Sequence, residues 1–82
     1  LPDAVKDAVY YEYGDNKTMD RLLQEFRERG LKILNMGIIH SKSNEKHNAC
    51  AIFTLRLHKG LDTDHLQQEI RATAGVVSVR EL

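Results

Sequence analysis

The segment that most constrains the fold is NACAIFTLRLH, residues 48–58, because its side chains alternate regularly between two kinds. Successive side chains of a β-strand point to opposite faces of the sheet. One face of this segment is therefore wholly apolar and holds Ala49, Ala51, Phe53, Leu55 and Leu57. The opposite face is mixed and holds Cys50, Ile52, Thr54, Arg56 and His58. The alternation predicts a strand whose apolar face must be covered by other elements of the chain.

Two flanking segments have the pattern of amphipathic helices that would supply this cover. In residues 17–29, apolar side chains recur at the helical spacing i, i+3, i+4 and i+7, at Met19, Leu22, Leu23 and Phe26. Gly30 would end this helix in a left-handed conformation. A second helix is predicted over residues 62–73, with Asp62 as its N-terminal cap and Gly75 as its stop.

Three more segments have strand character. Residues 9–13 and 76–82 are rich in β-branched or aromatic side chains. Residues 31–40 alternate imperfectly, and a β-bulge near Asn35 would return two later side chains to the core face, namely those of Met36 and Ile38. The polar stretch SKSNEKH at residues 41–47 is predicted to be an exposed hairpin loop.

The predicted order of elements is strand, helix, strand, strand, helix, strand. This order is typical of the ferredoxin-like βαββαβ fold, an α+β two-layer sandwich in which a four-stranded antiparallel sheet carries two helices on one face. Residues 8–82 are expected to form this single domain, and residues 1–7 are expected to be a linker. In the usual strand order of this fold, the segment 48–58 lies inside the sheet beside the first strand.

Composition excludes some classes of function and leaves others open. Twelve basic and twelve acidic side chains give a formal charge of zero, which argues against nucleic acid as the main partner because phosphate neutralisation needs a basic surplus. No apolar run approaches the roughly 20 residues of a membrane helix, so we expect no membrane insertion by these residues. Cys50 is the only cysteine, which excludes a disulfide within the chain.

Parts of the sequence resemble a known family. The element Gly75-Val76-Val77-Ser78-Val79, which follows the second predicted helix, resembles the corresponding strand of ACT-type regulatory domains. The stretches LLQEFRERGLKIL, AIFTLRL and LQQEIRATAGVVSV are similar to the cytoplasmic C-terminal domain of the MgtC/SapB family of bacterial inner-membrane proteins. This resemblance covers most of residues 8–82 and implies an ACT-like version of the ferredoxin-like fold.

The resemblance also implies a function and a location. It implies a non-catalytic regulatory or protein-interaction domain, linked to magnesium limitation, at the cytoplasmic face of the bacterial inner membrane. Residues 1–7 would then lead from an upstream membrane domain. The expected partners are that membrane domain and another membrane protein, and a homodimer is left open. No enzyme activity and no cofactor are expected, since the sequence has no P-loop or other catalytic motif.

The turn Gly14-Asp15-Asn16 is a candidate ligand-binding loop. Backbone N–H groups at the start of a helix attract a carboxylate or another anion. The same residues are also an ordinary choice for a strand-to-helix turn. ACT domains that bind amino acids usually carry a Pro-Gly turn here, which this chain lacks. The alternative function that depends on this loop is amino-acid sensing by an ACT domain of a soluble enzyme or regulator.

The uncovered face of the sheet is a candidate interaction face. It would hold Tyr10, Cys50, Ile52, Thr54 and Arg56, and it is either a contact surface for another protein or a half-polar face without a partner. A weaker alternative function is the metal-sensing domain of a cation efflux transporter. The histidines are not expected to converge on one ion, and a contact at Asp62, Asp64 and His65 competes with helix capping, so no metal site is predicted.

Overall fold

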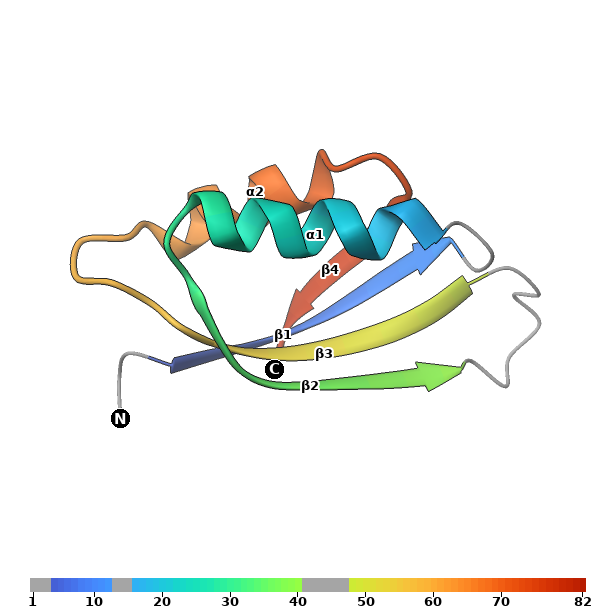
Figure 1. The fold of residues 1–82 in the computed structure, drawn as a ribbon, viewed down its shortest axis with the longest axis horizontal. Coiled ribbons are helices and arrows are strands. Elements are labelled where there is room, and N and C mark those ends of the chain that lie inside the picture. Colours follow the sequence, from blue (N-terminus) through green and yellow to red (C-terminus); the bar gives the residue numbers. More distant parts are fainter. Residues whose placement is uncertain (1–3, 13–15, 41–47) are drawn as a thin grey trace.

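The computed structural model describes residues 4–12, 16–40 and 48–82, and it confirms the predicted α+β class. Its elements follow in this order: β1 (Ala4–Glu12), α1 (Asn16–Glu28), β2 (Lys32–His40), β3 (Asn48–Arg56), α2 (Thr63–Arg71) and β4 (Val76–Glu81). The strands pair antiparallel in the order β2-β3-β1-β4. Both helices lie on the same side of the sheet (Figure 1). The strand β3 therefore lies inside the sheet, and β2 and β4 form its edges.

The apolar face of β3 is the centre of the core, as predicted. Four of its side chains are fully buried, those of Ala49, Ala51, Phe53 and Leu55. The helices cover them with Leu22, Phe26, Leu66 and Ile70. The rings of Phe26 and Phe53 meet edge to face, with their centroids 5.1 Å apart. The alternation of β3 and the helical spacing of α1 thus predicted the main contact between the two layers.

Local capping fixes two of the helix ends where the sequence predicts them. At the end of α1, the N–H of Gly30 donates to Arg27 O (3.0 Å) and the N–H of Leu31 donates to Phe26 O (2.9 Å), which is the Schellman arrangement. At the start of α2, Asp62 Oδ1 accepts hydrogen bonds from the N–H groups of Asp64 (3.0 Å) and His65 (3.3 Å). The carboxylate of Asp62 is therefore occupied as a helix cap.

The strand β2 carries the predicted bulge, and the side chains that the bulge returns to the core face are still partly exposed. The register shifts between Ile33 and Asn35, and beyond the shift Met36 pairs with Phe53 and Ile38 pairs with Ala51, both on the core side. The prediction that the bulge returns them to the core face is therefore confirmed, yet Met36 is 42% exposed and Ile38 is 49% exposed. The reason is the strand order: β2 is outermost, with a partner strand on one flank only.

The first strand is longer than predicted. It begins at Ala4 rather than at Val9, so the predicted linker over residues 1–7 is wrong for residues 4–7, and residues 1–3 lie outside the described part of the chain. Ala, Lys and Asp have low strand propensity, so the sequence pattern did not predict that the strand extends over these residues. Antiparallel pairing with β3 outweighs this low strand propensity, because Ala4 and Val5 lie opposite the last two residues of β3. Within the described ranges, neither helix has the length and apolar character that crossing a bilayer requires.

Candidate interaction surface

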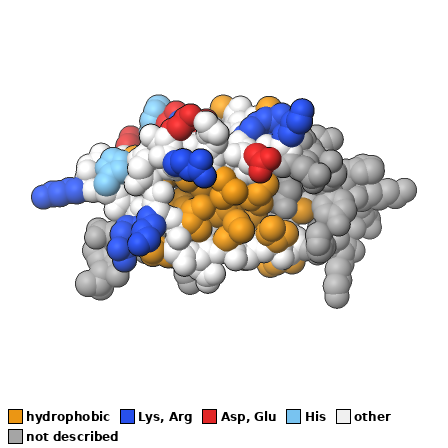
Figure 2. Space-filling view, viewed as in Figure 1, with side chains coloured by type: hydrophobic (Ala, Val, Ile, Leu, Met, Phe, Trp, Pro, Cys, Tyr) orange, Lys and Arg blue, Asp and Glu red, His pale blue; other side chains and the backbone are white. Residues whose placement is uncertain are grey.

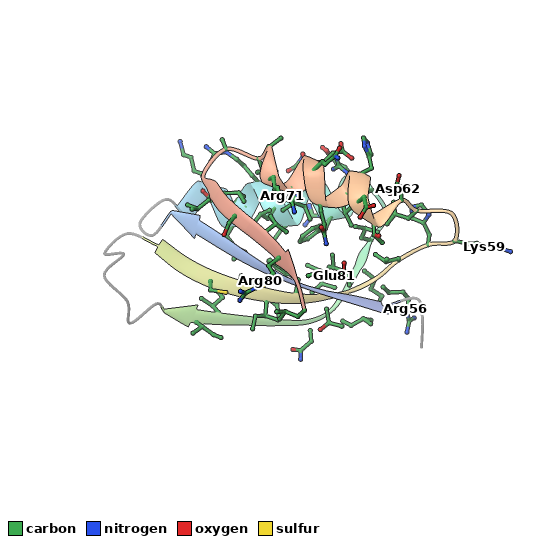
Figure 3. The ribbon with its side chains drawn as sticks, turned by 180° about the vertical axis from the view of Figure 1, so that it is seen from behind. Arg56, Lys59, Asp62, Arg71, Arg80 and Glu81 are labelled. Carbon is green, nitrogen blue, oxygen red and sulfur yellow. The ribbon has the colours of Figure 1, made fainter. Side chains whose placement is uncertain are left out.

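The predicted interaction face lies on the side of the sheet away from the helices, and its described apolar side chains, Cys50 and Ile52, are buried or half-buried. Cys50 is only 7% exposed, Ile52 and Thr54 are half-buried, and Arg56 is exposed. Figure 3 places Arg56 at the end of β3, before the loop that carries Lys59 to the start of α2. Tyr10 pairs with Cys50 in the sheet, but its side chain lies outside the described part of the structure.

A larger apolar surface lies on the neighbouring strand. Three large side chains that alternate along one face of β2 are between 41% and 49% exposed: Leu34, Met36 and Ile38. Ile39 is 52% exposed, but it pairs with Cys50 and lies on the opposite face of the sheet. Above the first three, Met19 and Leu23 of α1 are half-buried at the margin of the core. Figure 2 shows an apolar area on this side of the molecule, below α1. We call this surface the α1–β2 side and define it by Leu34, Met36 and Ile38 of β2 together with Met19, Asp20, Leu23 and Arg27 of α1.

Charged side chains of both signs border the apolar area. Asp20, Leu23 and Arg27 follow one another at the spacing i, i+3 and i+7, which places them along one flank of α1. The opposite flank of α1 faces α2, since Arg21 and Arg29 make their contacts there. Asp20 and Arg27 are exposed, and Figure 2 shows acidic and basic side chains beside the apolar area. The α1–β2 side therefore combines an apolar centre with one acidic and one basic group.

Sequence reasoning missed this surface for a specific reason. Alternation identifies the face of a strand to which a side chain points, but it does not identify which strand is at the edge of the sheet. The available signal was the stretch LNMGII at residues 34–39, which has no charge. Edge strands of monomeric proteins are commonly protected by charged side chains or proline.

A charged cluster joins the two helices on the outer surface of the helix layer. Arg29 donates to the carboxylates of both Glu25 and Glu69, and the Nε–Oε1 distance to Glu69 is 3.2 Å. His65 Nε2 lies 3.3 Å from the same Glu69 oxygen. The cluster lines a shallow groove of about 410 Å³, where Arg21 also donates to Ala74 O (3.0 Å). These groups compensate one another's charge and hold α1 against α2.

The cluster makes stability depend on pH in the acid range. The hydrogen bond from Arg29 holds the pKa of Glu69 below its ordinary value of 4.5, and the neighbouring His65 charge acts in the same direction. A carboxylate with a lowered pKa stabilises the folded chain fully above its unfolded pKa, and the contribution is lost as the pH falls through the lowered value. We expect Glu69→Gln to flatten the decline of the unfolding free energy below pH 4.5, measured by urea unfolding at successive pH values.

The control for this prediction is Glu28→Gln. Glu28 accepts a hydrogen bond from the neutral side chain of Gln24 (3.1 Å), so its removal breaks no ion pair with Arg29. We expect Glu28→Gln to keep the acid decline of the wild type. Identical pH profiles for the two variants would contradict the role of Glu69.

The other predicted site residues are not brought together into a binding site by the described structure. Gly14 and Asp15 lie outside the described residues, and Asn16 is the first residue of α1. His58 is exposed beside Lys59 O, and His65 pairs with Glu69. Within residues 4–12, 16–40 and 48–82, no three His, Cys, Asp or Glu side chains are grouped in a way that would hold a metal ion. The chain matches no protein-family model and no curated protein.

Proposed function

We propose that this chain is a non-catalytic regulatory domain that works by binding protein, and that it belongs to an MgtC/SapB-type bacterial membrane protein linked to magnesium limitation. The observation that carries the proposal is the α1–β2 side. Three large apolar side chains on one face of β2 are 41–49% exposed at the margin of the buried core: Leu34, Met36 and Ile38. Contiguous exposed apolar surface of this kind is typical of a protein contact site.

The ferredoxin-like, ACT-like arrangement is part of the same proposal. It is supported by the order β2-β3-β1-β4 and by the two helices on one side of the sheet. It is also supported by the positive φ of Gly75 (+92°), because this glycine begins the stretch GVVSV on which the resemblance rests. In the proposed protein, the domain lies at the cytoplasmic face of the inner membrane, beside the membrane domain that precedes it.

The test uses the intact gene product in its own bacterium. We expect the reading frame before Leu1 to encode apolar helices of about 20 residues each. We further expect that Ile38→Lys in the intact protein impairs growth in magnesium-poor medium nearly as much as deletion of the gene. The reason is that Ile38 is 49% exposed on the α1–β2 side and is not one of the buried core residues, so a charge there would disrupt a protein contact but not the core.

The matched control is Val77→Lys. Val77 is 58% exposed on β4, at the opposite edge of the sheet, so the same substitution there leaves the α1–β2 side unchanged. Immunoblots must show equal amounts of both variants, so that loss of growth is not loss of protein. Normal growth of the Ile38→Lys strain, or a catalytic domain encoded before Leu1, would refute the proposed function.

A further inference from the structure

We propose that the side of the sheet away from the helices binds the anionic headgroups of a lipid bilayer through Lys32, Arg56 and Arg80, together with Lys59 at the adjoining end of the molecule. We call these four residues the basic face. The inference rests on the proposed function for the presence of a membrane beside this domain. It adds a second contact that is separate from the α1–β2 side.

The register of the sheet places three of the cations on one side. Arg56 of β3 follows the buried Leu55, so its side chain belongs to the face away from the helices. Lys32 of β2 is the partner of Arg56 across the sheet and shares that face. Arg80 of β4 follows the buried Val79 and lies on the same side. All three are exposed.

The basic face is concentrated at the end of the molecule where β1 begins. Ala4, the first residue of β1, is the other partner of Arg56. Figure 3 shows Arg56 and Lys59 at this end, and Arg80 farther along the sheet. In the proposed protein, the chain reaches β1 from the membrane domain, so this is the end closest to the bilayer. A cluster of about four or more Lys and Arg side chains beside a membrane helix is typical of contact with anionic lipid.

The charges of the described residues are divided between the two sides of the molecule. The four cations of the basic face make no ion pair within the described ranges. The acidic side chains that the structure describes lie in the helices, in the cap of α2, or at Glu81, which accepts from Gln67 of α2 (3.3 Å). They are Asp20, Glu25, Glu28, Asp62, Asp64, Glu69 and Glu81. The chain is neutral as a whole, but its sheet side presents positive charge to an anionic surface.

The shape of this side suits a flat surface. Residues with small or half-buried side chains occupy most of the space between the cations: Gly37, Cys50, Ile52, Thr54 and Ser78. The long side chains of Lys and Arg can therefore reach a headgroup layer together. Ile39, on the same side, is 52% exposed and would enter the interface between headgroups and acyl chains. Peptide segments, in contrast, are commonly bound in grooves or at sheet edges.

This contact would also orient the α1–β2 side. With the outer side of the sheet on the bilayer, the helices face away from the membrane, because both lie on the opposite side of the sheet (Figure 1). The strand β2, as an edge of the sheet, then faces sideways along the membrane. The α1–β2 side would therefore be presented to another protein in the same membrane.

The first test measures binding of the 82-residue chain to sucrose-loaded vesicles by co-sedimentation. One set of vesicles contains phosphatidylglycerol and phosphatidylethanolamine, and the other contains phosphatidylcholine alone. We expect a partition constant at least about tenfold higher for the anionic vesicles, since each Lys or Arg near an anionic leaflet contributes roughly a factor of five. Added salt should weaken this binding, because it screens the charges.

Matched charge variants show whether the position of the cations matters. We expect Arg56→Gln to lower the partition constant about fivefold and Lys32→Gln/Arg56→Gln about 25-fold. The control is Arg71→Gln, which removes an exposed arginine of α2 on the opposite side and gives the same net charge as Arg56→Gln. It should change binding less than about twofold. Unchanged circular dichroism of each variant excludes unfolding as the cause.

A fluorescent reporter shows which side of the molecule meets the bilayer. The chain has no tryptophan, so Ile39→Trp and Gln68→Trp each introduce a single one. Ile39 lies on the outer side of the sheet, and Gln68 is exposed on α2. We expect anionic vesicles to shift the emission of the Ile39→Trp chain to shorter wavelength and to leave that of the Gln68→Trp chain unchanged.

Three results would overturn the lipid contact. They are equal binding to both kinds of vesicle, equal losses in Arg56→Gln and Arg71→Gln, and an emission shift at position 68 but not at position 39. Binding of polyglutamate that requires Arg56, without binding to anionic vesicles, would overturn it too and assign the basic face to an acidic protein.

The lipid contact and the proposed function can fail separately. If the reading frame before Leu1 encodes membrane helices and the chain does not bind anionic vesicles, the lipid contact is overturned and the proposed function stands. If the chain binds anionic vesicles through Arg56 but a catalytic domain precedes it, the proposed function is refuted and the lipid contact stands.

Discussion

Phe53→Ala is expected to lower the free energy of unfolding by about 3–5 kcal/mol, the usual cost of removing a fully buried phenylalanine side chain. The Phe53 ring is completely buried in the middle of β3, and it meets the ring of Phe26 on α1 edge to face. Native domains hold roughly 0.05–0.15 kcal/mol per residue, so 82 residues supply about 4–12 kcal/mol in total. At the lower end of this range the variant would be largely unfolded, whereas at the upper end it would keep more than half of its stability. Urea unfolding followed by circular dichroism measures the loss.

Two comparisons make this prediction specific. Thr54→Ala, one residue further along β3, changes a half-buried side chain on the opposite face and should cost less than about 1 kcal/mol. A double-mutant cycle with Phe26→Leu and Phe53→Leu should show a coupling of about 0.5–1.5 kcal/mol from the ring contact. If Phe53→Ala costs no more than Thr54→Ala, the layer contact described here is wrong.

The elements of the fold were predictable because their signals are local. The alternation of residues 48–58 and the apolar spacing of α1 each depend on neighbours a few residues apart, and both predictions agree with the burial in the structure. The bulge in β2 was predictable for the same reason, since the change in alternation occurs within one strand. Helix ends at Gly30 and Asp62 follow from backbone and side-chain groups close by in sequence.

The exposure of the sheet surfaces was not predictable, because it depends on the neighbours of each strand. Cys50 was expected on an open face, yet it is nearly buried. It is a small side chain on an internal strand, between Tyr10 of β1 and Ile39 of β2 in the register. Met36 and Ile38 lie on the core face as predicted, but they are partly exposed because β2 is an edge strand. The alternation of side chains along a strand does not show whether that strand is internal or at the edge of the sheet.

The charged cluster shows the same division between local and distant signals. Glu25 and Arg29 have the i, i+4 spacing of a helical ion pair, so that contact was available from the sequence. Glu69 is forty residues away from Arg29, and the two meet only because of the rotation and spacing of α1 and α2. The close approach of Thr18 to Gly75 at the other end of the helix pair was equally hidden.

Gly75→Ala is expected to lower the free energy of unfolding by about 2–5 kcal/mol, from two causes. The first is backbone strain: Gly75 has φ of +92°, where a residue with a Cβ is disfavoured by about 1–2 kcal/mol. The second is steric. A Cβ on Gly75 would lie 1.9 Å from Thr18 Oγ1 and 3.0 Å from Thr18 Cβ, and Thr18 is fully buried. Thr18 or the loop that follows α2 must therefore move, at about 1–3 kcal/mol for an overpacked site.

Gly30→Ala separates the two causes. Gly30 also has a positive φ (+71°), but no atom lies within 4 Å of the position of its Cβ, so this variant reports the strain alone, at about 1–2 kcal/mol. Urea unfolding should therefore rank Gly75→Ala as the more destabilising of the two. Thr18→Ala removes the closest atom, so the double variant Thr18→Ala/Gly75→Ala should lose less stability than the sum of the single changes. Equal losses at Gly30 and Gly75, together with simple additivity in the double variant, would show that Thr18 does not pack against Gly75.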